Sequence, residues 1–177
     1  MMTKKSLRMW FGLLAFLLLT PWPVAYAYDN GMAELQRVQI EGAESSATPT
    51  MKVFGRAIGS VTPGDLFYID TRGNSADALA TLYLTNTDEL IHYYRYLILK
   101  VGLYVESNNG VWKKASGQNG EPFPDTYLTL RNGLVSFALA GYIRYRVTIE
   151  GGNFYCFTGN ADGHRLAPQF YLTVNQA

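Results

Sequence analysis

Four aromatic side chains are the residues of this sequence best suited to contact a ligand. Tyr93, Tyr94 and Tyr96 stand close together, and Trp112 follows further along the chain. Tyrosine and tryptophan combine an apolar ring with a polar group, so exposed rings on a rigid sheet can stack on sugars and hydrogen-bond their hydroxyls. The sequence therefore predicts ligand aromatics at Tyr93, Tyr94, Tyr96 and Trp112. The alternative is that these rings fill the core.

Residues that carry metal or acid–base chemistry are sparse. The two histidines, His92 and His164, are not spaced as paired metal ligands, and no Cys-x-x-Cys or His-Glu-x-x-His motif occurs. Asn160 and Asp162 offer oxygen ligands for calcium, but their spacing is too short for a full binding loop. No Gly-x-Ser-x-Gly motif marks a serine nucleophile. We therefore predict no catalytic residue, no metal site and no cofactor, and a protein that is not an enzyme.

The first 27 residues have the composition of a secretory signal. Lys4, Lys5 and Arg8 precede an apolar run over residues 9–19, and Ala25 and Ala27 supply the small residues of a cleavage site. The run is shorter than the roughly 20 apolar residues that a membrane span needs. We expect cleavage after Ala27, export to the extracellular space or the cell surface, and no stable membrane span in the mature chain.

The net charge and the single cysteine limit the possible partners and crosslinks of the mature chain. Three of the fifteen basic residues lie in the signal, which leaves twelve bases against fourteen acids and a mature net charge of about −2. This balance argues against nucleic acid as a partner. Cys156 is the sole cysteine, so the exported chain has no internal disulfide, and its strand-like surroundings predict a buried thiol.

Apolar residues alternate with polar ones over most of the mature chain, and glycine-rich turns separate the alternating runs. This pattern predicts an all-β fold: a two-layer antiparallel β-sandwich over residues 51–177, jelly-roll or immunoglobulin-like, with about ten strands and little helix. We expect one strand over residues 51–58, and hairpin turns at residues 108–110, 131–133 and 150–153. Residues 91–106 fit either a strand or a helical stripe. Their branched and aromatic residues favour a strand, with a one-turn helix over residues 88–91 as the open alternative.

Residues 28–50 have the character of an extended amino-terminal arm. They contain one candidate strand, residues 35–40, followed by a polar linker over residues 41–49. Sheet edges attract further strands, and a strand donated by another chain covers such an edge. The arm therefore predicts self-association through a sheet edge or a donated strand, with Leu35, Val38 and Ile40 as the assembly residues.

Two parts of the chain resemble known families. Residues 61–65 (Val-Thr-Pro-Gly-Asp), residues 82–86 (Leu-Tyr-Leu-Thr-Asn) and the apolar run 97–104 resemble the early part of TasA/camelysin-type secreted fibre proteins. That resemblance implies a jelly-roll-like sandwich that polymerises into extracellular fibres through a donated amino-terminal strand. Residues 139–147 are similar to the corner before the sixth strand of immunoglobulin-like folds, which implies that Tyr145 ties down the preceding loop.

The leading interpretation is a secreted, non-enzymatic structural protein, a filament or biofilm-matrix subunit at the cell surface joined by strand donation. The alternative is a carbohydrate- or surface-ligand-binding β-sandwich module with a cell-surface glycan as its partner, which predicts exposed aromatics in a line or cleft. A small secreted hydrolase is the third interpretation, and it requires acids or a Ser–His pair that converge in a pocket.

Overall fold

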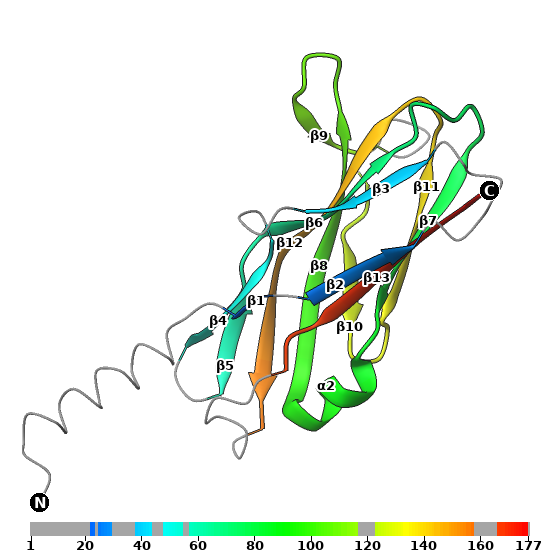
Figure 1. Ribbon diagram of the computed structural model, residues 1–177. Helices are drawn as coiled ribbons and strands as arrows, with labels where there is room; N and C mark the ends of the chain where they lie inside the picture. Colours follow the sequence, from blue (N-terminus) through cyan, green and yellow to red (C-terminus); the bar gives the residue numbers. More distant parts are fainter. Residues whose placement is uncertain are drawn as a thin grey trace, which may run out of the picture.

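The computed structural model describes residues 22–23, 25–29, 38–43, 48–54, 57–116, 123–157 and 166–176. Within these residues, thirteen strands form a nine-stranded and a four-stranded sheet, accompanied by one short helix (Figure 1). The buried apolar residues of both sheets belong to a single core cluster, so the two sheets are the layers of one sandwich. The predicted all-β sandwich is confirmed.

Two long strands form the centre of the large, nine-stranded sheet. They are β8 (Tyr94–Glu106) and β12 (Arg144–Cys156), each 13 residues long and paired antiparallel over nearly their whole length. The other edge of β12 carries β6 (Gly64–Asp70) and β5 (Ile58–Val61), and the other edge of β8 carries β9 (Trp112–Lys114) and β10 (Thr126–Thr129). Beyond them lie β3 (Gln39–Gly42), β4 (Thr50–Phe54) and β1 (Trp22–Pro23).

The smaller sheet has the strand order β11 (Leu134–Leu139), β7 (Ala78–Leu84), β13 (Gln169–Gln176) and β2 (Ala25–Asp29). Its pairs are antiparallel except that β2 runs parallel to β13. Alternation along each strand decides which side chains enter the core. On β7, Leu82 and Leu84 are buried and Tyr83 between them is partly exposed, as the sequence predicted.

The start of β8 corrects the strand predicted over residues 91–106. A helix, α2 (Thr87–Tyr93), includes the first three of those residues, and the strand begins at Tyr94. Asp88 and Glu89 stand in the first turn of α2, where carboxylates favour the positive end of the helix dipole. The fully buried Leu90 fixes the helix against the core, and this tertiary contact overrides the local strand preference of residues 91–93.

Three further predicted connections differ from the structure. Residues 51–58 form parts of two antiparallel strands, β4 and β5, because the alternating pattern breaks at Gly55. The turn at residues 131–133 joins β10 of the large sheet to β11 of the small one, so it crosses between layers and closes no hairpin. Residues 150–153 continue β12 through a bulge, where Gly151 takes φ of 148° and the register shifts. The turn at residues 108–110 does join β8 to β9, with Gly110 at φ of 77°.

The described residues of the predicted arm lie on their own sandwich. β3 pairs with β6 at Ile40↔Ile69, and both Val38 and Ile40 are buried. The observed strand is therefore Gln39–Gly42, a few residues later than the predicted 35–40. Leu35, residues 44–47 of the linker and residues 1–21 of the signal lie outside the described residues. Donation of this strand to another chain stays a prediction.

A tyrosine corner fastens the connection between β11 and β12. The Tyr145 hydroxyl accepts a hydrogen bond from the Ala140 N–H (2.8 Å) and approaches the Ala140 carbonyl (3.3 Å). The Thr71 hydroxyl bonds the carbonyls of Ala140 (2.9 Å) and Ile143 (2.7 Å) from the other side. The tie predicted for Tyr145 is confirmed, and it gives residues 140–143 a fixed shape.

We expect the substitution Tyr145→Phe to lower the free energy of unfolding by about 1–3 kcal/mol, because it leaves the Ala140 N–H without its partner. Urea denaturation would measure the change. Tyr83→Phe is the matched control on the smaller sheet, and we expect it to stay within about 0.5 kcal/mol of the parent. Equal losses for the two variants would contradict the corner's role.

Candidate functional site

Three aromatic rings and two guanidinium groups interleave on the outer face of the large sheet. Tyr68 comes from β6, Tyr104 from β8, Trp112 from β9, and Arg144 and Arg146 from β12. Tyr145 and Val147 alternate with the two arginines and are buried, so the arginines face away from the core. We call these five residues the arginine–aromatic face; it lies towards the β9 end of the molecule, and α2 lies at the other end (Figure 1).

Trp112 is the centre of this face. Its ring centroid is 5.8 Å from that of Tyr68, and the guanidinium carbons of Arg144 and Arg146 lie 5.9 and 4.9 Å from it. Arg144 is also 5.4 Å from the Tyr68 ring centre, and Arg146 is 5.0 Å from that of Tyr104. Each guanidinium thus lies within the range of a cation–π contact with two rings. The contacts hold rings and cations in a fixed array.

Carboxylates connect the rings and cations of the face to one another. Asp65 accepts hydrogen bonds from the Tyr68 hydroxyl (2.8 Å) and from Arg146 (3.3 Å). Glu150 accepts one from the Tyr104 hydroxyl (2.9 Å) and pairs with Lys114 at 3.0 Å. The network continues along β8 and β12 through two further ion pairs, Lys100–Glu150 (3.5 Å) and Lys100–Asp125 (2.7 Å).

Gly102 makes room for Glu150 in this network. A Cβ atom at position 102 would lie 2.5 Å from a carboxylate oxygen of Glu150 and 2.9 Å from its Cγ and Cδ. A side chain here would therefore push Glu150 off the sheet, away from Tyr104 and Lys114. The bare backbone of Gly102 lets the carboxylate lie flat on β8.

Two hollows open on the arginine–aromatic face. One, of about 560 Å³, is lined by Asp65, Tyr104, Arg146 and Glu150 among others. The second, of about 420 Å³, lies between the β8–β9 turn and the tyrosine corner, and it is lined by Arg72, Glu106, Ser107, Asn108, Gly110, Tyr142, Ile143 and Arg144. We call the second one the Arg144 hollow.

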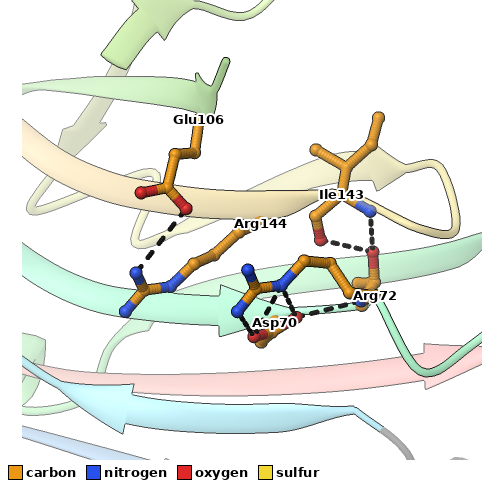
Figure 2. Close-up of polar contacts among 6 residues, drawn as sticks. Asp70, Arg72, Glu106, Ile143 and Arg144 are labelled. Carbon is orange, nitrogen blue, oxygen red and sulfur yellow. Dashed lines mark hydrogen bonds and ion pairs between the residues drawn. The ribbon is translucent and has the colours of Figure 1, made fainter. Parts of the chain in front are cut away.

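The two arginines of the Arg144 hollow differ in how far their donors are used. Figure 2 shows their guanidinium groups next to each other, with Glu106 on one side and Asp70 on the other. Arg72 makes three side-chain hydrogen bonds to Asp70, at 2.5 to 3.1 Å. The Arg144 guanidinium has a single long ion pair, 3.6 Å to Glu106, and no hydrogen bond within the described part of the chain.

Basic neighbours lower the pKa values of two carboxyl groups, those of Glu150 and Asp70. Burial acts to raise the pKa of Glu150, but hydrogen bonds from Lys114 and Tyr104 and the charge of Lys100 outweigh burial and hold it below its ordinary value. The hydrogen bond from Arg72 holds the pKa of Asp70 below its ordinary value as well. A glycosidase needs one carboxylic acid that keeps its proton near neutral pH. Glu150 is shifted in the opposite direction, so it does not fit that role.

Three tyrosines of the site and its corner are shifted upward in pKa. Burial is the first cause for Tyr68, Tyr104 and Tyr145, and hydrogen bonds to Asp65 and Glu150 add to it for the first two. The folded state therefore holds these protons more tightly than the unfolded chain does. The resulting stabilisation is fully present below the ordinary tyrosine pKa of about 10 and is lost as the pH rises through the folded-state values.

We therefore expect the free energy of unfolding to fall as the pH rises above about 10, together with tyrosine ionisation followed by ultraviolet absorbance. Glu150→Gln should move the pKa of Tyr104 downward, because it removes the negative carboxylate that accepts the hydrogen bond of the Tyr104 hydroxyl. The same change should leave Tyr145, which bonds Ala140, unaffected. Stability that stays constant through the tyrosine titration would contradict the expectation.

The structure separates the four predicted ligand aromatics. Trp112 is half-buried at the centre of the arginine–aromatic face, and Tyr96 is exposed on the same outer face, where its ring stacks on Tyr155 at 6.1 Å. Tyr94 is 1% exposed and fills the core. Tyr93 ends α2 and lines a separate hollow with Glu89, His92 and Leu166.

Sequence reasoning missed Tyr68, Tyr104, Arg144 and Arg146. The alternate spacing of Arg144 and Arg146 was visible, since it places both on one face of a strand. Their partners come from three other strands, and nothing local in the sequence indicates that pairing.

Other predicted residues have the following places. Cys156 is buried, as predicted. His164, Asn160 and Asp162 lie outside the described residues. In the part of the chain that the structure describes, no three His, Cys, Asp or Glu side chains gather as metal ligands, and no helix has the length and apolar character to cross a membrane.

Comparisons with known proteins found no matching family model and no matching curated protein. Among solved structures, the chain is similar to CpGH89CBM32-6 from Clostridium perfringens, with 11% identity over 80% of this chain and 95% of that one, at a TM-score of 0.32. It is similar to the CBM22-1 xylan-binding domain of Xyn10C from Paenibacillus barcinonensis, with 10% identity over 80% and 88% of the two chains and a TM-score of 0.23.

A third similar structure is CsCBM6-3 from Clostridium stercorarium in complex with cellobiose, with 13% identity over 87% of this chain and 98% of that one, at a TM-score of 0.23. These TM-scores are low. The two sheets of this chain therefore define its fold, and its own surface residues are the basis for its function.

Proposed function

We propose that this protein is a secreted, non-catalytic β-sandwich that binds carbohydrate through the arginine–aromatic face. The observation that carries the proposal is the position of Trp112. Two guanidinium carbons lie 5.9 and 4.9 Å from the centre of its ring, and two hollows of about 560 and 420 Å³ open on the same face. Tryptophan, tyrosine and arginine are the residue types that contribute most binding energy at interfaces.

The chemistry of the face suits a sugar. Rings of Trp112, Tyr68 and Tyr104 offer apolar surfaces for the C–H faces of a pyranose, and the tyrosine hydroxyls add polar contacts. The guanidinium groups of Arg144 and Arg146 donate hydrogen bonds, and the carboxylates of Asp65 and Glu150 accept them. Such a combination of rings and a few fixed polar groups is typical of small-molecule sites.

The face is also long enough for a chain of sugars. On β8, Tyr104, Lys100 and Tyr96 share the outer side, and Tyr104 and Tyr96 are eight residues or about 27 Å apart. Tyr96 with Tyr155 forms a second pair of rings at the far end. A polymeric glycan that lies along β8 would contact both groups of rings. Export through the predicted signal would bring the protein to such polymers.

The filament interpretation has less support in the described residues. Val38 and Ile40, two of its three assembly residues, are already buried, and Ile40 pairs with Ile69 of β6 in the same chain. Self-association by strand donation requires that this strand leave its own sheet.

Binding of the secreted protein to a panel of neutral and acidic oligosaccharides, followed by NMR titration of the isotope-labelled protein, tests the proposal. We expect the largest shifts at backbone amides of β8, β9 and β12. Absence of binding across the panel, or shifts confined to β7 and β13 of the smaller sheet, would refute it.

A further inference from the structure

We propose that the Arg144 hollow binds the carboxylate of an acidic sugar, so that the ligand of this face is a glycan that contains uronic acid. The inference rests on the proposed function and deepens it by naming the class of ligand. It is carried by three features of the hollow: the unused donors of Arg144, the exposed ring of Tyr142, and a local shape fixed by hydrogen bonds.

Arg144 has the donors that a carboxylate needs. A guanidinium group carries five N–H donors, and that of Arg144 makes no hydrogen bond within the described residues. Its nearest carboxylate oxygen, on Glu106, is 3.6 Å away, which is longer than a hydrogen bond. The neighbouring Arg72 is committed to Asp70 by three hydrogen bonds, and Arg146 bonds Asp65. Of the two arginines that line the Arg144 hollow, Arg144 is therefore the one available to a ligand.

The surroundings of Arg144 favour a planar anion. The Tyr68 and Trp112 rings, 5.4 and 5.9 Å from its guanidinium carbon, hold the group in place before the ligand arrives. A fixed, planar fork of two N–H groups matches the two oxygens of a carboxylate, and such charge-assisted pairs are the strong ones.

Tyr142 supplies a ring at the rim of the same hollow. Its side chain is 68% exposed, and its φ of 62° lies in the left-handed region that non-glycine residues avoid. The backbone N–H of Tyr142 donates to the carbonyls of Thr71 (3.0 Å) and Asn74 (3.1 Å), which holds this conformation. Backbone strain of this kind gathers at binding sites. Because Tyr142 and Arg144 line the same hollow, a sugar whose carboxylate binds Arg144 would lie beside this residue.

Glu106 is the group that opposes an acidic ligand. It lines the hollow and lies nearest to Arg144, so its charge repels an incoming carboxylate and competes for the guanidinium. Glu106→Gln should therefore strengthen the binding of an acidic sugar by about 2- to 5-fold. This factor corresponds to the free energy of a partly exposed ion pair.

Trigalacturonate and its methyl ester are the probes, since they share one sugar backbone and the methyl groups of the ester remove the charge of the carboxyl groups. For the unsubstituted protein we expect calorimetry to give a Kd about 10- to 100-fold lower for the acid than for the ester. Arg144→Gln should remove that difference. Arg144→Lys keeps the positive charge but lacks the planar pair of N–H donors, so it should retain part of the difference between acid and ester. Lys113→Gln, which removes an exposed charge beside Trp112 on the same strand, is the control and should retain it fully.

A second variant guards against loss of folding. Tyr142→Asn removes the ring and keeps a residue that tolerates positive φ, so it should fold as the parent does and bind both probes more weakly. Equal affinity for acid and ester, or a preference that survives Arg144→Gln, would overturn this inference and leave the proposed function standing. Tighter binding of a sulfated sugar than of the uronate would also overturn it. Failure of every glycan in the panel to bind would instead refute the proposed function.

Discussion

Replacing Trp112 with alanine is expected to weaken glycan binding by about 30-fold or more and to leave the sandwich folded. The indole ring contacts Tyr68, Arg144 and Arg146 at once, so it occupies the centre of the proposed contact surface. Central tryptophans at interfaces contribute about 2 kcal/mol or more, which corresponds to this factor in Kd. Trp112 lies on the outer face, so its removal opens no cavity in the core. Isothermal titration calorimetry against the best glycan of the panel would measure the loss.

Two further variants define what the loss means. Trp112→Phe keeps a ring at the same place and should retain more affinity than Trp112→Ala. Tyr83→Ala removes a partly exposed aromatic residue from the smaller sheet, where its ring centroid lies 6.3 Å from that of Tyr171. This variant should leave the affinity for the glycan unchanged. A Trp112→Ala protein that binds as tightly as the parent, or a Tyr83→Ala protein that loses affinity, would place the glycan elsewhere on the molecule.

The substitution Phe154→Ala is expected to lower the free energy of unfolding by about 3–5 kcal/mol, the range for a fully buried phenylalanine. Phe154 is 0% exposed and meets the edge of Tyr94, with the ring centroids 5.5 Å apart. It lies on β12, the strand that pairs with β8, β6 and β5. A cavity here would weaken the centre of the large sheet. Urea denaturation at neutral pH would give the change.

The neighbouring residue provides the matched control. Tyr155 follows Phe154 on β12 but faces outward, where it stacks on Tyr96. We expect Tyr155→Ala to lower the free energy of unfolding by about 1 kcal/mol, because it removes a surface cross-strand pair and opens no cavity. If the two alanine variants were equally destabilised, the assignment of inner and outer faces at this end of β12 would be wrong.

The layers of the fold were predictable because they depend on local patterns. Alternation placed Leu82 and Leu84 inward and Tyr83 outward, and the turn at residues 108–110 was marked by its own asparagines and glycine. The errors arose where two patterns coincide. Residues 91–93 suit a strand by composition, but Leu90 had to reach the core from a helix. The glycines of residues 150–153 suit a turn, but they form a bulge in one continuous strand.

The site was harder to predict than the fold, for a physical reason. An aromatic residue in a strand is exposed or buried according to the register of that strand, and register depends on partners far away in the sequence. Tyr94 and Tyr96 would share one face of a regular strand, yet one is 1% and the other 41% exposed, because the pairing of β8 with β12 shifts between Tyr155 and Cys156. The role proposed for Arg144 depends on Tyr68 of β6 and Trp112 of β9, which lie beside it only in the folded sheet.

The parallel strand β2 affects which edge of the smaller sheet is exposed when the chain is produced with or without residues 1–27. It occupies Ala25–Asp29, so the expected processing point after Ala27 falls inside it. Processing there would leave only Tyr28 and Asp29 opposite Leu172 and Thr173. The backbone of Gln169, Phe170 and Tyr171 would lose its β2 partner, while β13 would keep β7 on its other edge. Chains with and without residues 1–27 would therefore differ at one edge of the smaller sheet. An exposed strand edge can pair with another chain, so analytical ultracentrifugation of the two forms would show whether only the shorter one self-associates.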